Sequence, residues 1–378
     1  NFMPQKDLEL ATGRRSAEVG LRYDRLAVAR IAPDIKLPQE PLRGLTVLFD
    51  TSASRALDFD RQIADLATLL KDLQSQTGED FTLRVVAFDQ STAEIYAGPA
   101  SGFGPAEIER ISTRRALGAS DLRQALAAVA IGPVLPRVLV LSDGIATAGP
   151  RELAQIEAAA HALAAAGVQR IDAIVDGGIQ DAEVLRQIST TELLSHGVVL
   201  DARLPQDDIT RKLTTTTLAD MKVVVPGAGW VWPDTLRGMQ PGDEALVYAD
   251  LPEDVAMRVI LTGDQRIDVS VPTTPVERPL LERAWVGARI ERLTSMRSAL
   301  PAGDTDVRNA FRTQIVDLST RFRVLSDFTA LLVLETENDY RRFGIDRNAL
   351  SDILTVDANG INLLQRKDRS EERRVGKE

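Results

Sequence analysis

The chain has 378 residues, of which 44% are hydrophobic and 26% are charged, as is typical of a globular protein with more than one domain. Its formal net charge of -10 argues against nucleic acid or an anionic membrane surface as a partner. The sequence has no cysteine, which excludes disulfides and thiolate metal sites, and no stretch is apolar enough to form a transmembrane segment.

Residues 1–42 contain one stretch of strand-like alternation, at 17–32, followed by a proline-rich segment at 33–41. We expect one or two amphipathic strands and then an extended linker. So few hydrophobic residues do not form a core alone, and the segment is predicted to pack on a neighbouring domain. Because the sequence begins at Asn1 without an initiator Met or a signal pattern, we expect a fragment or a processed product.

Residues 43–205 alternate between apolar strand-like runs and amphipathic helices. This alternation predicts an α/β domain with a doubly wound, mostly parallel, Rossmann-like sheet and helices on both faces. The strands are expected at 45–50, 83–88, 93–97, 138–141, 170–175 and 198–200, and the helices at 58–73, 121–130, 152–165 and 181–188. The charged stretch at 107–110 is interpreted as solvated surface.

Beyond residue 205 the pattern changes. Short β-type runs between Gly-, Pro- and Asp-rich turns predict a small antiparallel β unit over 206–275. A helical part over 276–345 is expected to hold helices at 280–300 and 306–322 and a closing strand at 329–335. The end of the chain, 346–378, is predicted to be a largely disordered tail.

Oxygen-bearing side chains follow two of the predicted strands where the strands end. The apolar run 45–49 leads into Asp50, with Ser52 and Ser54 beyond it, and the run 138–141 leads into Ser142 and Asp143. A further hydroxyl, Ser120, precedes a helix in a glycine-containing loop. Because the carboxyl ends of parallel strands meet at one edge of a sheet, these loops are expected to meet around one ion. Oxygen donors of this kind suit Mg²⁺, Ca²⁺ or Mn²⁺.

A simpler interpretation exists for each loop separately. An Asp-x-Ser-x-Ser sequence also caps turns and helices. Asp121, next to Ser120, is interpreted as the N-cap of the following helix.

The order of the three loops resembles that of the von Willebrand factor A-type (VWA) domain with its metal-ion-dependent adhesion site. The resemblance covers about 43–205 and rests on three motifs, Asp50-Thr51-Ser52-Ala53-Ser54, Ser120 and Ser142-Asp143-Gly144. It implies that Ser52, Ser54 and Ser120 ligate one divalent cation, and that Asp50 and Asp143 hold it directly or through water. The family usually has Thr at Ser120, so the hydroxyl is kept. Where the family often has an apolar residue, this chain has Arg55, whose charge is expected to compete with the cation.

The second half of the chain extends the resemblance. Residues 281–293 resemble the helix after the A domain in inter-alpha-trypsin-inhibitor heavy-chain-like proteins, and 322–333 resembles their "VLSPFTA" segment, with Asp327 in place of proline. The chain is thereby identified as a bacterial-type member of the VIT/VWA group. The resemblance implies that residues 1–42 are the remnant of a VIT domain and that the protein is extracytoplasmic or on the cell surface.

Three functions are weighed on these residues. The resemblance implies a cation-dependent, adhesion-type protein-binding module and not an enzyme, with an Asp or Glu of a protein partner completing the metal coordination. The first alternative is a metal-free scaffold with a vestigial site, for which Arg55 is the main support. The second is Mg-dependent phosphoryl transfer with Asp50 as nucleophile. Against it, Ser52 stands where haloacid-dehalogenase-type enzymes need a second Asp, and the three loops contain no lysine.

Overall fold

The computed structural model describes residues 19–150, 152–301, 303–330, 337–342, 353–357 and 360–364. The chain divides into two compact units between Val324 and Leu325. The described part of the first unit contains an α/β domain, a β-sandwich and two long helices. The described part of the second contains a short helix and a β-hairpin.

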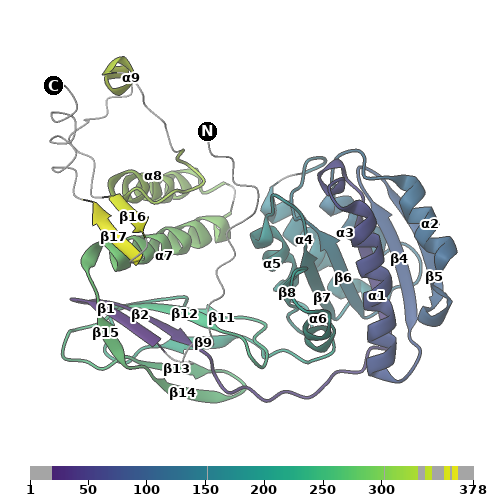
Figure 1. The fold of residues 1–378 in the computed structure, drawn as a ribbon, viewed down its shortest axis with the longest axis horizontal. Coiled ribbons are helices and arrows are strands. Elements are labelled where there is room, and N and C mark those ends of the chain that lie inside the picture. Colours follow the sequence, from purple (N-terminus) through teal and green to yellow (C-terminus); the bar gives the residue numbers. More distant parts are fainter. Residues whose placement is uncertain are drawn as a thin grey trace. The chain divides into compact units, whose positions relative to one another are not determined.

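The α/β domain is built on a six-stranded sheet with the order β5-β4-β3-β6-β7-β8 (Figure 1). Its strands are β3 (Gly44–Asp50), β4 (Thr82–Phe88), β5 (Thr92–Pro99), β6 (Arg137–Ser142), β7 (Arg170–Val175) and β8 (Val199–Asp201). Neighbouring strands are parallel except for β5, which runs antiparallel to β4. The doubly wound, mostly parallel sheet predicted from the sequence is confirmed.

Helices cover both faces of this sheet because its central strands are apolar on both sides. One face carries α1 (Phe59–Thr77), α2 (Pro105–Arg114) and α6 (Gln206–Leu213), and the other carries α3 (Leu122–Val129), α4 (Leu153–Ala166) and α5 (Ala182–Ser189). All of β3 is buried, and its successive side chains point to opposite faces. Val47 and Phe49 therefore join the core beneath α1, while Leu48 joins the core beneath α3 and α4.

Two of these helices differ from the sequence-based expectation. The charged stretch 107–110 is half-buried to exposed, as expected, but it lies on a helix that was not expected. This helix, α2, has Pro105 in its first turn and buries Ile111, and the Gly104 N–H donates to the Glu107 carboxylate at 3.0 Å. Helix α6 lies where a β unit was expected and adds Ile209 and Leu213 to the core of the sheet. Both helices have too few apolar residues to show a clear helical period in the sequence. Because α6 packs on the sheet, the α/β domain extends past residue 205.

The β-sandwich is assembled from strands on both sides of the α/β domain in the chain. One sheet has the order β10-β12-β2-β1-β15 and the other β11-β9-β13-β14. The strands are β1 (Val19–Tyr23), β2 (Leu26–Ile31), β9 (Met221–Val224), β10 (Trp230–Trp232), β11 (Thr235–Leu236), β12 (Ala245–Asp250), β13 (Arg258–Thr262), β14 (Arg266–Ser270) and β15 (Thr273–Pro275). A shared apolar core contains Ala29 of β2, Val247 of β12 and Leu261 of β13. The N-terminal strands are thus integral to the sandwich, and the α/β domain is inserted into it.

Helices α7 (Arg278–Ala299) and α8 (Thr305–Phe322) follow the sandwich and pack on each other. Aromatic contacts hold α7 on the sheet: the ring centroids of Trp230 and Trp285 are 5.0 Å apart, and the Arg289 guanidinium lies 4.9 Å from the Trp285 ring. Trp232 donates its indole N–H to Glu291 at 3.3 Å. Trp230 and Trp232 of β10 therefore both contact helix α7.

The second unit contains α9 (Glu337–Arg342) and the antiparallel strands β16 (Ile353–Asp357) and β17 (Gly360–Leu364). This hairpin lies within the stretch expected to be a largely disordered tail. The expected closing strand at 329–335 falls mostly on residues outside the described ranges. Among the described residues, no helix is long and apolar enough to cross a membrane.

The chain crosses between the sandwich and the α/β domain twice, and the two crossings run side by side. Gln39 and Thr215 form an antiparallel bridge. Glu40 donates its backbone N–H to the Thr214 carbonyl at 2.7 Å, and Thr216 donates to the Pro38 carbonyl at 3.1 Å. The expected linker is therefore one strand of a paired connection.

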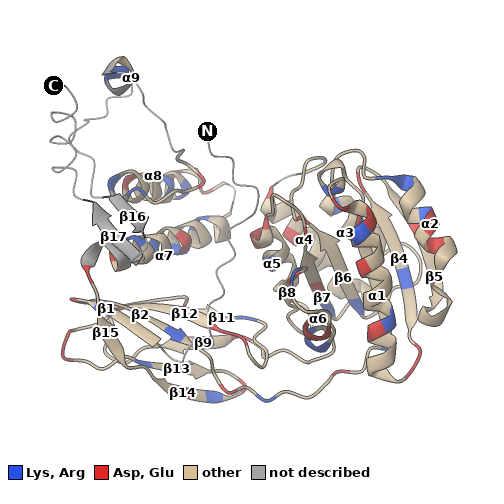
Figure 2. Cartoon of the chain, viewed as in Figure 1, with Lys and Arg blue, Asp and Glu red and all other residues tan. Residues whose placement is uncertain are grey.

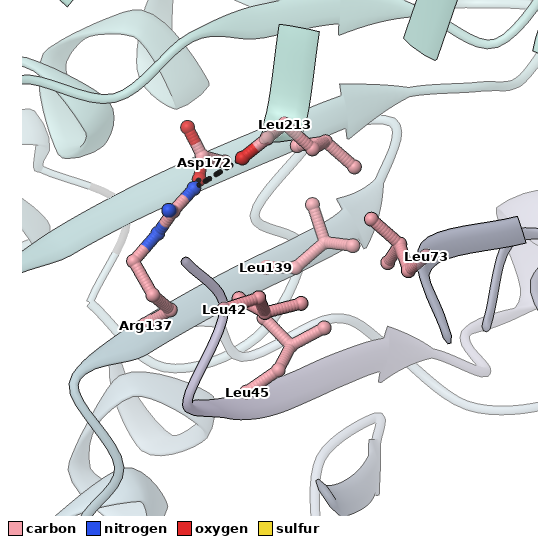
Figure 3. Close-up of a pocket in the computed structure, with 7 residues that line it drawn as sticks. All are labelled: Leu42, Leu45, Leu73, Arg137, Leu139, Asp172 and Leu213. Atoms are coloured by element: carbon pink, nitrogen blue, oxygen red, sulfur yellow. Dashed lines mark hydrogen bonds and ion pairs between the residues drawn. The ribbon is translucent and has the colours of Figure 1, made fainter. Parts of the chain in front are cut away.

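A buried charge network fastens this connection to the sheet. Basic residues lie within the strands themselves, as the blue band on β4 shows (Figure 2). They include Arg84 in β4, Arg137 in β6 and Arg170 in β7. Arg137 and Arg170 both pair with the buried Asp172 and both lie 3.1 Å from Glu40. Arg137 also donates to the Leu213 carbonyl at 2.8 Å. Beside Arg137, leucine side chains and Asp172 line a small pocket of about 10 Å³ (Figure 3).

Candidate metal centre

The residues predicted to bind a cation lie on three loops at the C-terminal edge of the six-stranded sheet. They are Asp50 at the end of β3, Ser52 and Ser54 in or beside the 3₁₀ helix η1 (Ala53–Arg55), Ser120 before α3, and Asp143 directly after β6. A second 3₁₀ helix, η2 (Ala100–Gly102), lies outside these loops. The predicted residues therefore share one edge of one sheet.

Asp50 is the residue on which the three loops converge. Its buried carboxylate accepts hydrogen bonds from the Ser142 hydroxyl at 2.6 Å and from the Ser120 hydroxyl at 3.4 Å, both at Oδ2. Its Oδ1 accepts the backbone N–H of Ser52 at 2.9 Å. The Ser52 and Ser54 hydroxyl oxygens lie 3.1 Å apart. Four oxygen-bearing side chains thus form a connected group around one carboxylate.

Asp143 carries the clearest sign of a missing charge partner. Its Oδ1 accepts the Ile145 N–H at 2.9 Å, whereas its Oδ2 is buried and has no hydrogen-bond partner. A buried carboxylate oxygen without a partner is costly, because it loses its hydration without replacement. Burial also raises the pKa of Asp50, and the charge of Asp143 raises it further. A divalent cation beside both carboxylates would relieve both costs, so these residues fit the predicted ion.

Arg55 lies beside this group, but its ion pair is with another residue. Its side chain is only 2% exposed, it donates to the Asp176 carbonyl, and its Nη2 lies 3.5 Å from the Asp176 carboxylate. Gly177 lies next to both Arg55 and Asp143. A Cβ atom added at Gly177 would be 3.2 Å from the Asp143 Cβ and 3.4 Å from the Arg55 Nη1, so the guanidinium lies near Asp143. Burial lowers the pKa of Arg55, and the charges of Asp50, Asp176 and Asp143 oppose that shift.

Supporting residues that the sequence analysis does not single out hold the first loop in place. The Thr51 hydroxyl donates to the Phe88 carbonyl at 3.0 Å and accepts from Arg114 Nε at 3.0 Å. Arg114 also donates to the Asp89 carboxylate at 2.6 Å. Thr51 lies inside the Asp50–Ser54 motif, and its place there is the only feature of the sequence that points to its role. Arg114 is at the end of α2, so it could be found only after that helix is known.

The remaining polar residues near the loops have ordinary structural roles. Asp121 accepts the backbone N–H of Gln124 at 2.9 Å, which confirms that it is the N-cap of α3. In the part of the chain that the structure describes, no three His, Asp or Glu side chains are grouped to hold a metal. The candidate centre consists of two carboxylates and several hydroxyls. Oxygen ligands of this kind, with few negative charges, suit a hard cation.

No protein-family model matches the chain, and no curated protein matches it. Among solved structures, the chain is similar to a von Willebrand factor type A protein from Catenulispora acidiphila, with 15% identity, 92% of this chain and 89% of that chain covered, and a TM-score of 0.41. It is similar to the ArnB paralog VWA2 from Sulfolobus acidocaldarius, with 11% identity, 82% and 92% covered, and a TM-score of 0.32.

A third similar structure is proximal thread matrix protein 1 from the mussel byssus, with a zinc-occupied MIDAS motif. The identity is 21%, 51% of this chain and 52% of that chain are covered, and the TM-score is 0.36. Because all three TM-scores are below 0.5, these similarities carry no argument, and the α/β fold is described from the strand order of the chain itself.

Proposed function

We propose that the α/β domain is a VWA-type protein-binding module that holds one divalent cation. The observation that carries the proposal is the convergence of three loops on Asp50, next to the unpartnered Oδ2 of Asp143. In this proposal the hydroxyls of Ser52, Ser54 and Ser120 ligate Mg²⁺, Ca²⁺ or Mn²⁺. Asp50 and Asp143 hold the ion directly or through water.

Such an ion keeps part of its positive charge and can accept a carboxylate from a protein partner. The residues of this chain orient the donors: Ser142 fixes one oxygen of Asp50, and the Ser52 N–H fixes the other. Burial of Asp50 and Asp143 limits competition from bulk water. A partner presenting Asp or Glu is therefore the proposed ligand.

We propose binding rather than catalysis at this edge. The three loops offer no lysine, and Ser52 stands where a phosphoryl-transfer enzyme of the aspartyl-nucleophile type needs an acid. The Asp50 oxygens are engaged by Ser142, Ser120 and the Ser52 N–H. A carboxylate held in this way is better suited to supporting an ion than to attacking a substrate.

Membership of the VIT/VWA group is the finer part of the proposal. It is supported by residues 281–293, which lie within α7. Strands β1 and β2 pair with each other and with β15 and β12. These strands belong to the sandwich, and the interpretation of residues 1–42 as the remnant of a VIT domain stays a prediction.

The burial of Arg55 favours one other candidate, a scaffold that works without metal. In that candidate the guanidinium, close to Asp143 and paired with Asp176, supplies the positive charge that a cation would otherwise supply. A titration with divalent cations separates the cation-binding module from the metal-free scaffold.

The test is calorimetric titration of the full chain with Mg²⁺, Mn²⁺ and Ca²⁺. Saturable binding at one site is expected, and Asp50→Ala and Ser52→Ala should each abolish it while urea unfolding stays cooperative. Ser75→Ala, at an exposed position on α1, is the matched control and should bind as the parent does. Absence of binding by all three ions in the parent would support the metal-free scaffold.

A further inference from the structure

Three exposed apolar side chains stand on the loops around the candidate metal centre. Leu57 is 73% exposed, Leu117 is 61% exposed and Ile179 is 80% exposed. They are three of the five most exposed large apolar side chains among the described residues. The other two, Ile131 and Leu194, follow α3 and α5 and so belong to the opposite edge of the sheet. We call Leu57, Leu117 and Ile179 the apolar rim.

Hydrogen bonds fix the rim loops to the first metal-binding loop. Leu117 donates its backbone N–H to the Thr51 carbonyl at 3.0 Å, and Ala53 donates to the Gly118 carbonyl at 2.9 Å. On the other side, Arg55 donates to the Asp176 carbonyl in the loop that carries Ile179. Leu57 closely follows Arg55 in the chain. The rim is therefore tied to the proposed cation site.

Four of the five predicted cation ligands are buried, and the fifth, Ser54, is exposed. Asp50, Ser52, Ser120 and Asp143 are all buried, while the three rim side chains extend into solvent. A carboxylate that reaches the centre must enter on a projecting side chain. The residues next to it in the partner would then lie against the rim. Isolated exposed leucines are ordinary, whereas one on each of three loops around a buried polar site indicates a contact surface.

We propose that the apolar rim selects the partner: the site takes a protein segment in which an Asp or Glu is flanked by large apolar residues. This inference rests on the proposed function, because the bound cation attracts the carboxylate. Charge complementarity fixes the acidic residue, and the rim fixes its neighbours. Burying one leucine-sized side chain corresponds to about a tenfold change in affinity. The rim residues thus determine specificity without contacting the ion.

The test is selection of a displayed library of short random peptides on the immobilised full chain in Mn²⁺, with elution by a chelator. The expected peptides contain Asp or Glu next to Leu, Ile, Phe or Met. The rim variant Leu57→Ser/Leu117→Ser/Ile179→Ser is expected to bind Mn²⁺ as the parent does in calorimetry, but to select acidic peptides without apolar neighbours. A parent-selected peptide should bind each single rim variant about tenfold more weakly.

The matched control is Ile131→Ser/Leu194→Ser, which removes equally exposed apolar side chains from the opposite edge and should select the same peptides as the parent. The inference is overturned if parent-selected peptides lack apolar neighbours, or if the rim variant selects the same peptides as the parent. It is also overturned if the parent binds Mn²⁺ but selects no peptide. Failure of the parent to bind Mn²⁺ overturns the proposed function itself, and this inference with it.

Discussion

The guanidinium of Arg55 donates to the backbone carbonyl of Asp176, a residue 121 positions away in the chain. This contact joins the loop after β3, which carries Ser52 and Ser54, to the loop after β7. Arg55 forms no ion pair with Asp50 or Asp143, although it lies close enough for their charges to affect its pKa. Arg55 therefore links the first loop of the candidate centre to a neighbouring loop that carries none of the predicted cation ligands.

Replacing Arg55 with Met should separate its effect on the ion from its effect on the fold. Removal of a nearby positive charge is expected to raise Mg²⁺ affinity roughly tenfold. Loss of the donor to the Asp176 carbonyl should lower the free energy of unfolding by about 1–3 kcal/mol. Calorimetry and urea unfolding measure the two effects. Arg61→Met is the control, since Arg61 pairs with the same aspartate at 3.2 Å but is half exposed. Unchanged Mg²⁺ affinity in Arg55→Met would contradict charge competition.

Asp143→Asn should weaken ion binding and raise the stability of the metal-free protein. The substitution removes a buried charge whose Oδ2 has no partner and which raises the pKa of Asp50. Without metal, the variant is expected to be more stable than the parent by about 1 kcal/mol. In Mg²⁺ the parent should gain stability and the variant should not. Thermal unfolding with Mg²⁺ or with chelator measures this, and a variant stabilised by Mg²⁺ as strongly as the parent would remove Asp143 from the centre.

Arg114→Met should weaken cation binding although Arg114 is not a proposed ligand. The side chain holds Thr51 and Asp89, so its loss should loosen the first loop. We expect Mg²⁺ affinity to fall by about tenfold, roughly the effect of one hydrogen bond. Arg110→Met is matched to it, because Arg110 is on the same helix and donates to the carbonyls of Ile95 and Glu94. Equal losses of Mg²⁺ affinity in both variants would assign the effect to α2 as a whole.

Cation affinity should fall as the pH is lowered. Burial raises the pKa of Asp50, and Asp143 adds to the shift, so a proton competes with the cation at a higher pH than at an exposed aspartate. Titration of Mn²⁺ from neutral into acidic solution should show progressively weaker binding and uptake of a proton on release of the ion. A constant affinity across this range would show that Asp50 does not hold the ion as a carboxylate.

The charge network of Asp172, Arg137 and Arg170, at the opposite edge of the sheet, should also lose its effect in acid, here as a loss of stability. Burial alone would raise the pKa of Asp172, but the charges of Arg170 and Arg137 outweigh it and hold this pKa below its usual range. Its contribution to stability is therefore present above the unfolded pKa of about 3.9 and is lost as the pH falls through the folded pKa. Asp172→Asn should cost about 3–5 kcal/mol at neutral pH. Urea unfolding should show this difference shrinking in acid, and a difference that stays constant with pH would contradict the assignment.

Local patterns in the sequence predict most of the strands of the α/β domain. Leu45–Phe49 and the run 138–141 predict buried strands because every residue is apolar or β-branched, and Asp50 and Asp143 follow from the ends of those strands. The rest depends on contacts between distant residues. Nothing near β2 indicates that it pairs with β12, and nothing near Arg55 indicates Asp176. Helix α2 gives no helical pattern in the sequence because it buries one side chain, Ile111, and Arg114 lies on this helix.

The paired crossings at Gln39 and Thr215 have a mechanical consequence. The candidate cation site lies at the C-terminal edge of the sheet and the crossings lie at the N-terminal edge. A force applied at the candidate site would therefore travel along the strands of the domain. It reaches the sandwich through two segments bonded to each other and, through Glu40, to Arg137 and Arg170. Such a force would be shared by both segments, and extending either one would require those bonds to break.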